Sequence, residues 1–316
     1  MKEFTVSQSE EGKRLDKYVT GIMKNAPTSF CYKMLRKKNI VLNGKKASGS
    51  EQLKAGDAVT FYLADDTFAK FTNERHTVSG YTQMMPPVVY EDDDVLIVDK
   101  PSGMLSQKSS ANDISLNEIC LSYLYDRKCI DDGSLMTFVP SVCNRLDRNT
   151  SGLVTFAKTY KGAKVLADVF KKRSVHKYYR CIAVGSVNND IELTGSLVKD
   201  EKTNTVTVSD DENDGAYIDT LIRPVSSTDG LTVCDICLIT GRTHQIRAHL
   251  AHIGHPLLGD YKYGNRKIND VYKEKYGVDS QILTCYKMEF PDDLPLTGLA
   301  GKTVTVGLPD IFSKVM

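Results

Sequence analysis

Residues 144–152 read NRLDRNTSG and mark a change of structure along the chain. The run Asn-Thr-Ser-Gly favours a turn, and the apolar stretch GLVTFAK that follows at 152–158 predicts a strand. The next stretch, YKGAKVLADVFKKR at 160–173, carries its apolar side chains at helical spacing and predicts a helix. A strand and a helix in such close succession are typical of a chain that mixes both kinds of element.

Extended apolar runs and helical patterns continue on both sides of this stretch. Many of the runs are joined by short, hairpin-like turns, which favour antiparallel neighbours. We therefore expect an α+β fold with a mixed, mostly antiparallel sheet flanked by helices. The expected strands cover 88–90, 95–98, 178–185, 231–240 and 302–308, and the expected helices cover 115–126 and 243–253.

The composition is that of a globular chain with more than one domain. Its 316 residues are enough for two domains and a substantial core, and hydrophobic residues make up 41% of them. No apolar run approaches the length of a membrane span, and the start, MKEFTVSQSEEGKR, lacks the apolar core of a signal peptide. Eight cysteines in such a chain are most simply free thiols. We therefore expect a cytoplasmic protein.

The first module is expected to run from residue 1 to 65. Helical spacing predicts one helix in RLDKYVTGIM and a second in TSFCYKMLRKKN, with Thr28 or Ser29 as the N-cap of the second. Asn43-Gly44 lies between short extended runs and predicts a two-residue hairpin turn. Residues 66–85 show no clear period and are expected to be a linker, and the second domain then covers 86–316.

A local excess of positive charge distinguishes the first module. Residues 13–46 hold ten Lys or Arg and one acid, although the whole chain has a net charge of only +1. Such a block is often a solvated surface. However, two small helices and a hairpin in this order resemble the S4-like RNA-binding domain, which implies a face that holds RNA phosphates. The residues of that basic face are Lys33, Arg36, Lys37, Lys38 and Lys45.

The acid in the opening stretch, Asp147, lies between Arg145 and Arg148. Two adjacent cations favour the ionised form of a carboxyl group, so we expect a carboxylate that serves as a nucleophile or electrostatic stabiliser rather than as an acid. The alternative is an Arg-Asp-Arg network on the surface that fixes a loop.

A second stretch, GRTHQIRAHLAHIGHPLLGD at 241–260, predicts a helix with Thr243 as its N-cap and Gly254 at its C-cap. His244 and Arg247 share one face of that helix, away from the core. Arg247 would then stand on a rigid mount, either as a catalytic cation or as the partner of a structural acid.

A third stretch, HKYYRCIAVG at 176–185, predicts a strand in which Lys177 and Tyr179 point to the same side. A tyrosine in a cleft can stack on a base and present its hydroxyl. The alternative is that Tyr179 simply belongs to the core.

These three stretches, in this order, resemble the pseudouridine synthases of the RluA family, which modify uridines in ribosomal and transfer RNA. The matching motifs are RLDRNTSGL from Arg145, Lys177-x-Tyr179, and GRTHQIR from Gly241. The opening stretch of the second domain, YEDDDVLIVDKPSGM, and the later stretch HPLLGDYKYG match as well. Where the family has His, this chain has Asn144, which we interpret as a change in substrate contact or local packing.

The resemblance implies an RNA-modifying isomerase that works without cofactor or metal. It implies Asp147 as the catalytic carboxylate, Arg247 as its salt-bridge partner and Tyr179 as the residue that stacks on or assists the base. Arg145 would contact a phosphate or fill the gap that a flipped uridine leaves. The RNA-binding set of this domain is Arg145, Arg148, Lys177, Arg242 and His244. The RNA partner is expected to be large-subunit ribosomal RNA, with transfer RNA as the other candidate.

Other functions fit the sequence less well. His244, His249, His252 and His255 suggest zinc, but no Cys or carboxylate cluster completes the site. A Cys-x-x-Cys pair at 234–237 lies in a strand pattern, which sends its side chains to opposite faces. A nucleotide hydrolase would normally show a metal or a nucleophile–base pair. The main alternative is an RNA-binding assembly factor that keeps the fold but lacks the activity.

Overall fold

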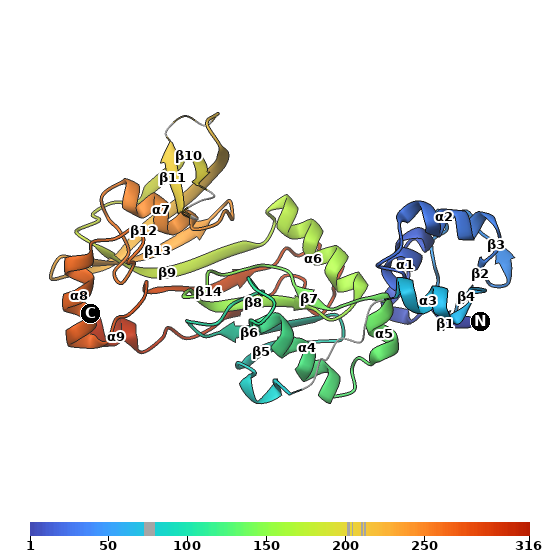
Figure 1. The fold of residues 1–316 in the computed structure, drawn as a ribbon. Helices are drawn as coiled ribbons and strands as arrows, with labels where there is room; N and C mark the ends of the chain where they lie inside the picture. Colours follow the sequence, from blue (N-terminus) through green and yellow to red (C-terminus); the bar gives the residue numbers. More distant parts are fainter. Residues whose placement is uncertain (73–79, 201–202, 204, 210, 212) are drawn as a thin grey trace.

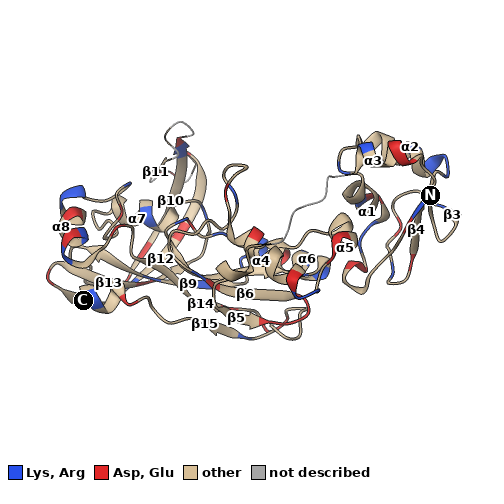
Figure 2. Cartoon of the chain, turned by 60° about the horizontal axis from the view of Figure 1, so that its bottom comes forward, with Lys and Arg blue, Asp and Glu red and all other residues tan. Residues whose placement is uncertain are grey.

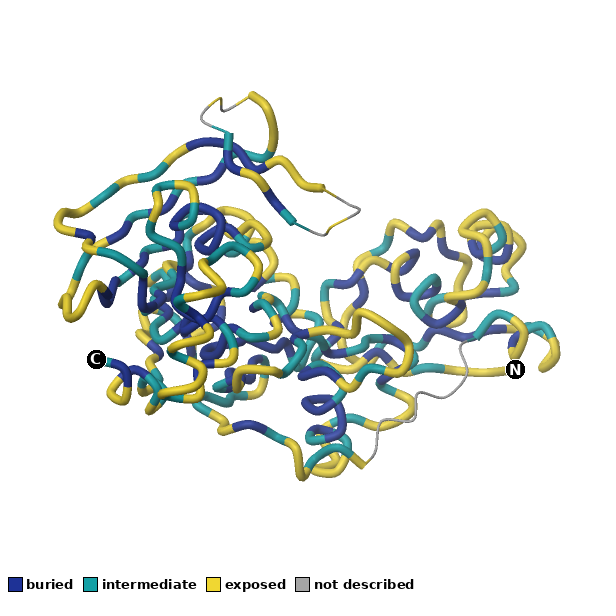
Figure 3. The backbone as a smooth tube through the Cα atoms, turned by 60° about the vertical axis from the view of Figure 1, so that its left-hand side comes forward, coloured by how far each residue is buried: buried dark blue, intermediate teal, exposed yellow. Residues whose placement is uncertain are grey.

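The computed structural model describes residues 1–72, 80–200, 203, 205–209, 211 and 213–316. Figure 1 shows a small N-terminal body at one end of an elongated molecule and a larger body, built on a long sheet, that carries the C-terminus at the other end. Buried segments gather in both bodies (Figure 3), and each has its own apolar cluster. None of the described helices is both long and apolar enough to cross a membrane.

The N-terminal body is a four-stranded antiparallel sheet, as far as the described residues go, covered by helices. Its hairpin turn is the predicted one, since Asn43 and Gly44 both have positive φ, at 49° and 70°. Apolar side chains from all three helices pack on the sheet, among them Leu15, Met34 and Phe68. The elements are β1 (Lys2–Thr5), the 3-10 turn η1 (Gln8–Glu10), α1 (Leu15–Ile22), α2 (Thr28–Arg36), β2 (Ile40–Leu42), β3 (Lys45–Lys46), β4 (Ala58–Phe61) and α3 (Asp65–Phe71).

Two predictions for this body are wrong. The N-cap of α2 is Pro27, and Thr28 is already the first helical residue. Helix α3 begins at Asp65, where a linker was expected, and its Phe68 is buried with the N-terminal core. The body therefore extends through residue 71. Of the expected linker, residues 73–79 lie outside the described part of the chain.

A buried lysine joins the two bodies. Lys13 precedes α1 and is only 6% exposed. Its ammonium donates a hydrogen bond to the carbonyl of Thr137 in the larger body and lies 5.3 Å from the ring centre of Tyr160. Met136 packs against the N-terminal apolar cluster at the same place. The N-terminal body is thus docked on the larger one through specific contacts.

The larger body is built on one twisted sheet, in the order β11-β10-β12-β13-β9-β14-β8-β6-β5 along the described residues, with β15 beside β14 and β7 beside β8. Its strand pairs are antiparallel except for β14 with β8. The predicted α+β class with a mixed, mostly antiparallel sheet is confirmed. The strands are β5 (Val88–Glu91), β6 (Val95–Lys100), β7 (Ser141–Val142), β8 (Ser151–Ala157), β9 (His176–Val184), β10 (Ile191–Asp200), β11 (Thr205–Ser209), β12 (Ala216–Thr228), β13 (Leu231–Leu238), β14 (Leu283–Glu289) and β15 (Thr303–Thr305).

Helices cover this sheet and complete its core. Helix α6 packs on β8 and α7 packs on β11 and β12, and buried Leu166 and Leu250 carry the helices into the main apolar cluster. The β10–β11 hairpin projects from the sheet next to α7 (Figure 1). The helices are the 3-10 turn η2 (Thr82–Met84), α4 (Leu116–Asp126), α5 (Asp132–Thr137), α6 (Tyr160–Lys172), α7 (Gln245–His252), α8 (Arg266–Tyr276) and α9 (Ile311–Val315).

Candidate active site

Asp147 lies in the loop between β7 and β8, and hydrogen bonds fix this loop from several sides. The buried hydroxyl of Ser106 donates to the carbonyl of Leu146 and accepts from its amide, at 2.9 and 3.1 Å. The Thr150 amide closes a turn on the carbonyl of Asp147. The expected turn after Asp147 is confirmed, and the side chain of Asp147 remains 24% exposed beside it.

A fully buried ammonium supports the same loop from beneath. Lys100, at the end of β6, donates to the carbonyls of Pro101, Met104 and Arg148 at 2.8 to 3.1 Å. Burial lowers the pKa of Lys100 to about 8, although the charge of Asp147 opposes this. These three carbonyls accept the hydrogen bonds that the ammonium would otherwise donate to water.

Asn144 fixes the start of the loop to β8. Its side-chain oxygen accepts both the amide and the hydroxyl hydrogen of Thr155, each at 2.8 Å, and its amide donates to the carbonyl of Leu153 at 3.3 Å. Thr155 is fully buried. Asn144 therefore makes local packing contacts and also lines the cleft described below, so both interpretations of the departure from the family's His stay open.

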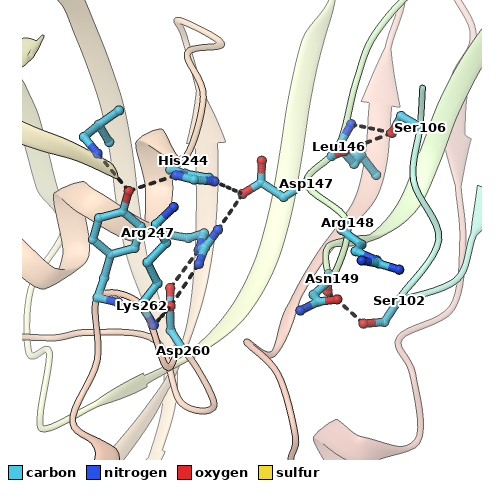
Figure 4. Close-up of polar contacts among 12 residues, drawn as sticks. Ser102, Ser106, Leu146, Asp147, Arg148, Asn149, His244, Arg247, Asp260 and Lys262 are labelled. Carbon is cyan, nitrogen blue, oxygen red and sulfur yellow. Dashed lines mark hydrogen bonds and ion pairs between the residues drawn. The ribbon is translucent and has the colours of Figure 1, made fainter. Parts of the chain in front are cut away.

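Arg247 connects Asp147 to a second carboxylate. Its Nη1 donates to Asp147 Oδ2 at 3.0 Å, while Nε and Nη2 donate to the two oxygens of Asp260 at 2.7 and 3.0 Å (Figure 4). Burial alone would raise the pKa of Asp260, but the hydrogen bonds and charge of Arg247 hold it below its usual range. Arg247 thus pairs with a structural acid and with Asp147 at the same time, and its role as a catalytic cation stays a prediction.

Helix α7, which carries Arg247, begins later than predicted. Its first residue is Gln245, and its N-cap is His244, whose backbone is left-handed with φ of 55°. Thr243 is therefore not the N-cap. Instead the side chain of Gln245 folds back and accepts the Arg242 amide at 3.0 Å and the Thr240 hydroxyl at 2.8 Å.

The two arginines that flank Asp147 in the sequence do not pair with it within the described part of the chain. Arg148 donates to the carbonyl of Gly103 at 3.2 Å, and the side chains of Arg145 and Arg148 are exposed. The expected pairing of Asp147 with its sequence neighbours is therefore not found among the described residues. The cation that contacts Asp147 is Arg247, a hundred residues later.

Tyr179 lies in β9 and is 5% exposed. It lines the same cleft as Asp147, and burial, followed by the neighbouring Cys285 and Asp147, raises its pKa well above the usual value. Its hydroxyl therefore keeps its proton. Lys177 points to the same side of β9, as expected, and also lines the cleft; burial lowers its pKa.

The cleft that contains these side chains has a volume of about 900 Å³. Asp147 is the one carboxylate among its described lining residues, whereas lysines and arginines recur around it. Four of these cations, at positions 108, 171, 173 and 199, come from elements that the sequence did not connect with the site. The lining cations are Lys108, Arg145, Lys171, Arg173, Lys177, Lys199, Arg242 and Arg247.

The histidines and cysteines considered for metal or redox chemistry lie in separate places. His249 bonds Thr220 at 2.9 Å, and His255 lies 3.1 Å from the Val184 carbonyl. No group of three or more His, Cys, Asp or Glu side chains suited to a metal occurs among the described residues. Cys234 is buried opposite Cys181, so it points away from the half-buried Cys237, and no disulfide joins the eight cysteines.

Six basic residues of the N-terminal body, which we call its basic face, are exposed. Figure 2 marks the Lys and Arg segments of this body in blue. Helix α2 carries the first two of these residues, Lys37 and Lys38 directly follow it, and β3 carries the last two. All are exposed, as the sequence predicts: Lys33, Arg36, Lys37, Lys38, Lys45 and Lys46.

A cleft with eight cations around one arginine-held carboxylate is suited to bind a polyanion. The comparisons with known proteins name the class. A profile of the RNA pseudouridylate synthase family matches residues 94–252, which include the three motifs described above. The chain belongs to this family, and its resemblance to the RluA-type enzymes is confirmed. It is an RNA pseudouridine synthase, an isomerase that acts on RNA.

Individual relatives agree with this. The chain is 30% identical to the "Uncharacterized RNA pseudouridine synthase" of Mycoplasma capricolum, over 99% of this chain and 100% of that one. It is 27% identical to the "Ribosomal large subunit pseudouridine synthase C" of Vibrio cholerae, over 90% and 87% of the two chains. The solved structure of human RNA Pseudouridylate Synthase Domain Containing 4 has the same fold, with a TM-score of 0.58 at 19% identity, covering 74% of this chain and 92% of that one.

Proposed function

We propose that the protein converts specific uridines of large-subunit ribosomal RNA to pseudouridine, with Asp147 as the catalytic carboxylate and without a cofactor. The observation that carries this proposal is that Asp147 is the one carboxylate among the described cleft residues and is held 3.0 Å from Arg247. The choice of RNA rests on the name of the Vibrio cholerae relative.

The reaction exchanges one bond to the ribose for another. The bond between ribose C1′ and uracil N1 breaks, the base rotates, and a bond forms between C1′ and C5. C5 then gives up its proton and N1 gains one, so the reaction consumes no electrons and no second substrate. The protein has to supply a carboxylate near C1′, a pocket for the detached uracil and contacts that extrude the nucleotide.

The geometry of Asp147 suits this task. Its Oδ2 accepts a hydrogen bond from Arg247 (Figure 4), while Oδ1 makes no hydrogen bond within the described residues, and Asp147 lines the cleft. Oδ1 is therefore the atom that meets the target nucleotide, whether it attacks the sugar, attacks the base or takes a sugar proton. Tyr179, with its proton retained, offers its ring face and hydroxyl to the uracil.

The positive residues supply affinity for the RNA backbone. Lys177 and Arg242 line the cleft, and exposed Arg145 can occupy the gap that the flipped uridine leaves. Arg148 is exposed but is not among the lining residues. The N-terminal body, the S4-like module of our domain division, adds its exposed basic face on the same molecule. The catalytic domain then corresponds to residues 86–316.

Two measurements test this proposal. Pseudouridine is mapped in ribosomal and transfer RNA from cells with and without the protein, and we expect at least one large-subunit uridine to lose its modification. In vitro, Asp147→Asn should abolish isomerisation while RNA binding survives, because the amide keeps the shape of the side chain and removes the charge. The wild type should remain active in EDTA. Unchanged modification maps, or a fully active Asp147→Asn variant, would exclude the proposed chemistry.

A further inference from the structure

Tyr263 connects the β10–β11 hairpin to the active site. Its hydroxyl accepts the amide hydrogen of Val206 in β11 at 3.0 Å and lies 2.8 Å from Nδ1 of His244. Its ring also lies edge-on to His244, with 5.6 Å between ring centres, and 5.1 Å from the guanidinium carbon of Arg247. His244 is therefore held by a side chain that packs on Arg247 itself.

This network assigns the proton of His244. A tyrosine hydroxyl has one hydrogen, and the Val206 amide already occupies an acceptor position on its oxygen. The arrangement that uses every group has the hydroxyl donating to Nδ1 of His244. Burial lowers the pKa of His244, although the charge of Asp147 opposes this, so the ring is neutral at physiological pH. The neutral ring then carries its hydrogen on Nε2.

Nε2 of His244 lies close to Asp147 at the edge of the same cleft. The distance from Nε2 to Asp147 Oδ2 is 3.9 Å, too long for a direct hydrogen bond. The two side chains point toward each other in Figure 4, and both line the cleft. The backbone of His244 is left-handed, with φ of 55° and ψ of 14°, an unusual conformation for a non-glycine residue that fixes the direction of this ring.

We propose that Nε2–H of His244 donates a hydrogen bond to the ribose 2′-hydroxyl of the target uridine, and that this hydroxyl in turn donates to Asp147. An oxygen that lies to the side of the line joining Nε2 and Oδ2 can be about 2.8 Å from both atoms. A hydroxyl can accept from an N–H and donate to a carboxylate at the same time, which a carbonyl cannot do. This inference rests on the proposed function, because a carboxylate placed against C1′ lies next to the 2′ oxygen.

The consequence is that His244 makes the active site selective for ribose. The 2′-hydroxyl is the group by which a protein distinguishes RNA from DNA at a given nucleotide. His244 acts here as a binding residue rather than as an acid or base, since its proton stays on Nε2. Tyr263 acts as a positioning residue, because it touches His244 and not the nucleotide.

The test compares two substrates in the wild type and in several variants of the full chain. One substrate is an RNA fragment around a uridine found by the mapping above, and the other carries 2′-deoxyuridine at that single position. Single-turnover rate and equilibrium affinity are measured for both, and the ribose preference is their ratio within each variant. Because it is a ratio within one variant, a loss of folded protein cancels.

The wild type should prefer ribose by about 10-fold or more, as one hydrogen bond to a charged network requires. His244→Ala should reduce the preference to below about 3-fold. His244→Gln, whose side-chain amide presents an N–H near the position of Nε2, should retain most of it. Tyr263→Phe should reduce it, while Tyr261→Phe, whose hydroxyl bonds Asp270 instead, should leave it unchanged.

Two outcomes overturn this inference and leave the proposed function standing. One is an equal ribose preference in the wild type and His244→Ala. The other is a loss of discrimination between uridine and cytidine in His244→Ala at an unchanged ribose preference, which would place His244 on the base edge. A wild type that forms no pseudouridine in the uridine fragment would overturn the proposed function, and this inference with it.

Discussion

The guanidinium of Arg247 holds the carboxylate of Asp260 with two hydrogen bonds, at 2.7 and 3.0 Å, and the Asp260 side chain is completely buried. A buried ion pair with this geometry fixes both partners. It also leaves the third nitrogen of the guanidinium, Nη1, directed at Asp147. Asp260 therefore positions Arg247 against Asp147 although it does not line the cleft.

Asp260→Asn should damage stability and turnover together. The amide can accept only one of the two hydrogen bonds that Arg247 donates at this position, so the buried charge of Arg247 is partly uncompensated. Breaking such a buried pair costs about 3–5 kcal/mol. Urea unfolding measures the loss of stability, and single-turnover kinetics measures the loss of rate.

The matched control is Asp235→Asn. Asp235 makes the same two-bond contact with Arg180, at 2.7 Å for each bond, but the pair is about a quarter exposed and lies outside the cleft. This change should cost no more than about 1 kcal/mol and leave the rate unchanged. Equal effects of the two variants would show that Asp260 has no special relation to the site.

Asn144→Ala should loosen the loop that carries Asp147. The change leaves the amide and hydroxyl of buried Thr155 without their common acceptor, at about 1–3 kcal/mol per unsatisfied group. We expect lower stability in urea and a lower rate. Asn144→His offers a ring nitrogen as an acceptor and should lose less of both. A stable and fully active Asn144→Ala variant would contradict this account of the loop.

His249 should make the protein less stable in mild acid. It is 1% exposed, its Nε2 lacks a partner among the described residues, and burial lowers its pKa from 6.5 to about 4. Between these two pH values the unfolded chain binds the proton and the folded chain does not. The stability is thus complete above pH 6.5 and decreases as the pH falls toward 4, by about 3 kcal/mol in total.

The variant His249→Asn tests this assignment. Its side-chain oxygen can still accept the Thr220 hydroxyl, but the side chain no longer titrates. Urea unfolding at a series of pH values should show a flatter decrease between pH 6.5 and 4 than in the wild type. His176→Asn, at an exposed position in β9, should keep the wild-type slope. The same slope in all three proteins would assign the acid sensitivity to other groups.

The basic face of the N-terminal body should contribute affinity without affecting chemistry. Replacing Lys37, Lys38 and Lys45 by Ala should raise the KM for a long RNA and leave the single-turnover rate at saturation unchanged. The slope of log affinity against log salt should fall by roughly 2, at about 0.7 for each lost phosphate contact to a single strand. Filter binding at several salt concentrations measures this slope.

Three exposed lysines of α8, Lys267, Lys273 and Lys275, serve as the control set. Helix α8 lies in the larger body, at the opposite end of the molecule from the N-terminal body (Figure 1). Their replacement should leave KM and the salt slope unchanged. An equal effect of both sets would reduce the basic face to general surface charge. A lower rate at saturation in the first set would show that this face positions the target.

Local signals in the sequence were sufficient wherever one short segment determines its own structure. Asn43-Gly44 requires positive φ at two positions, and the hairpin follows. The apolar spacing of α6 and α7 gave both helices to within two residues. In contrast, α3 is only seven residues long. In β10, buried and exposed side chains alternate only weakly, because much of the strand projects from the core. Neither pattern stands out from a loop.

The site was predictable in its motif residues and not in their partners. Asp147, Tyr179 and Arg247 were found because each belongs to a motif, and the structure brings all three to one cleft. Asp260 lies thirteen residues beyond Arg247 in an irregular segment, and its only sign was the motif HPLLGD. Cations such as Lys108 and Lys199 come from unrelated segments, and only the folded sheet places them around the same opening.

The lysine contact between the two bodies has a consequence for the way in which a long RNA binds. Because Lys13 is buried against Thr137 and Tyr160, the basic face and the cleft are carried on one docked unit. On the proposed function, an RNA that has reached one of them would find the other at a high effective concentration, since no second loss of overall freedom is required. A fragment too short to span both sites would then lose that advantage whatever its sequence.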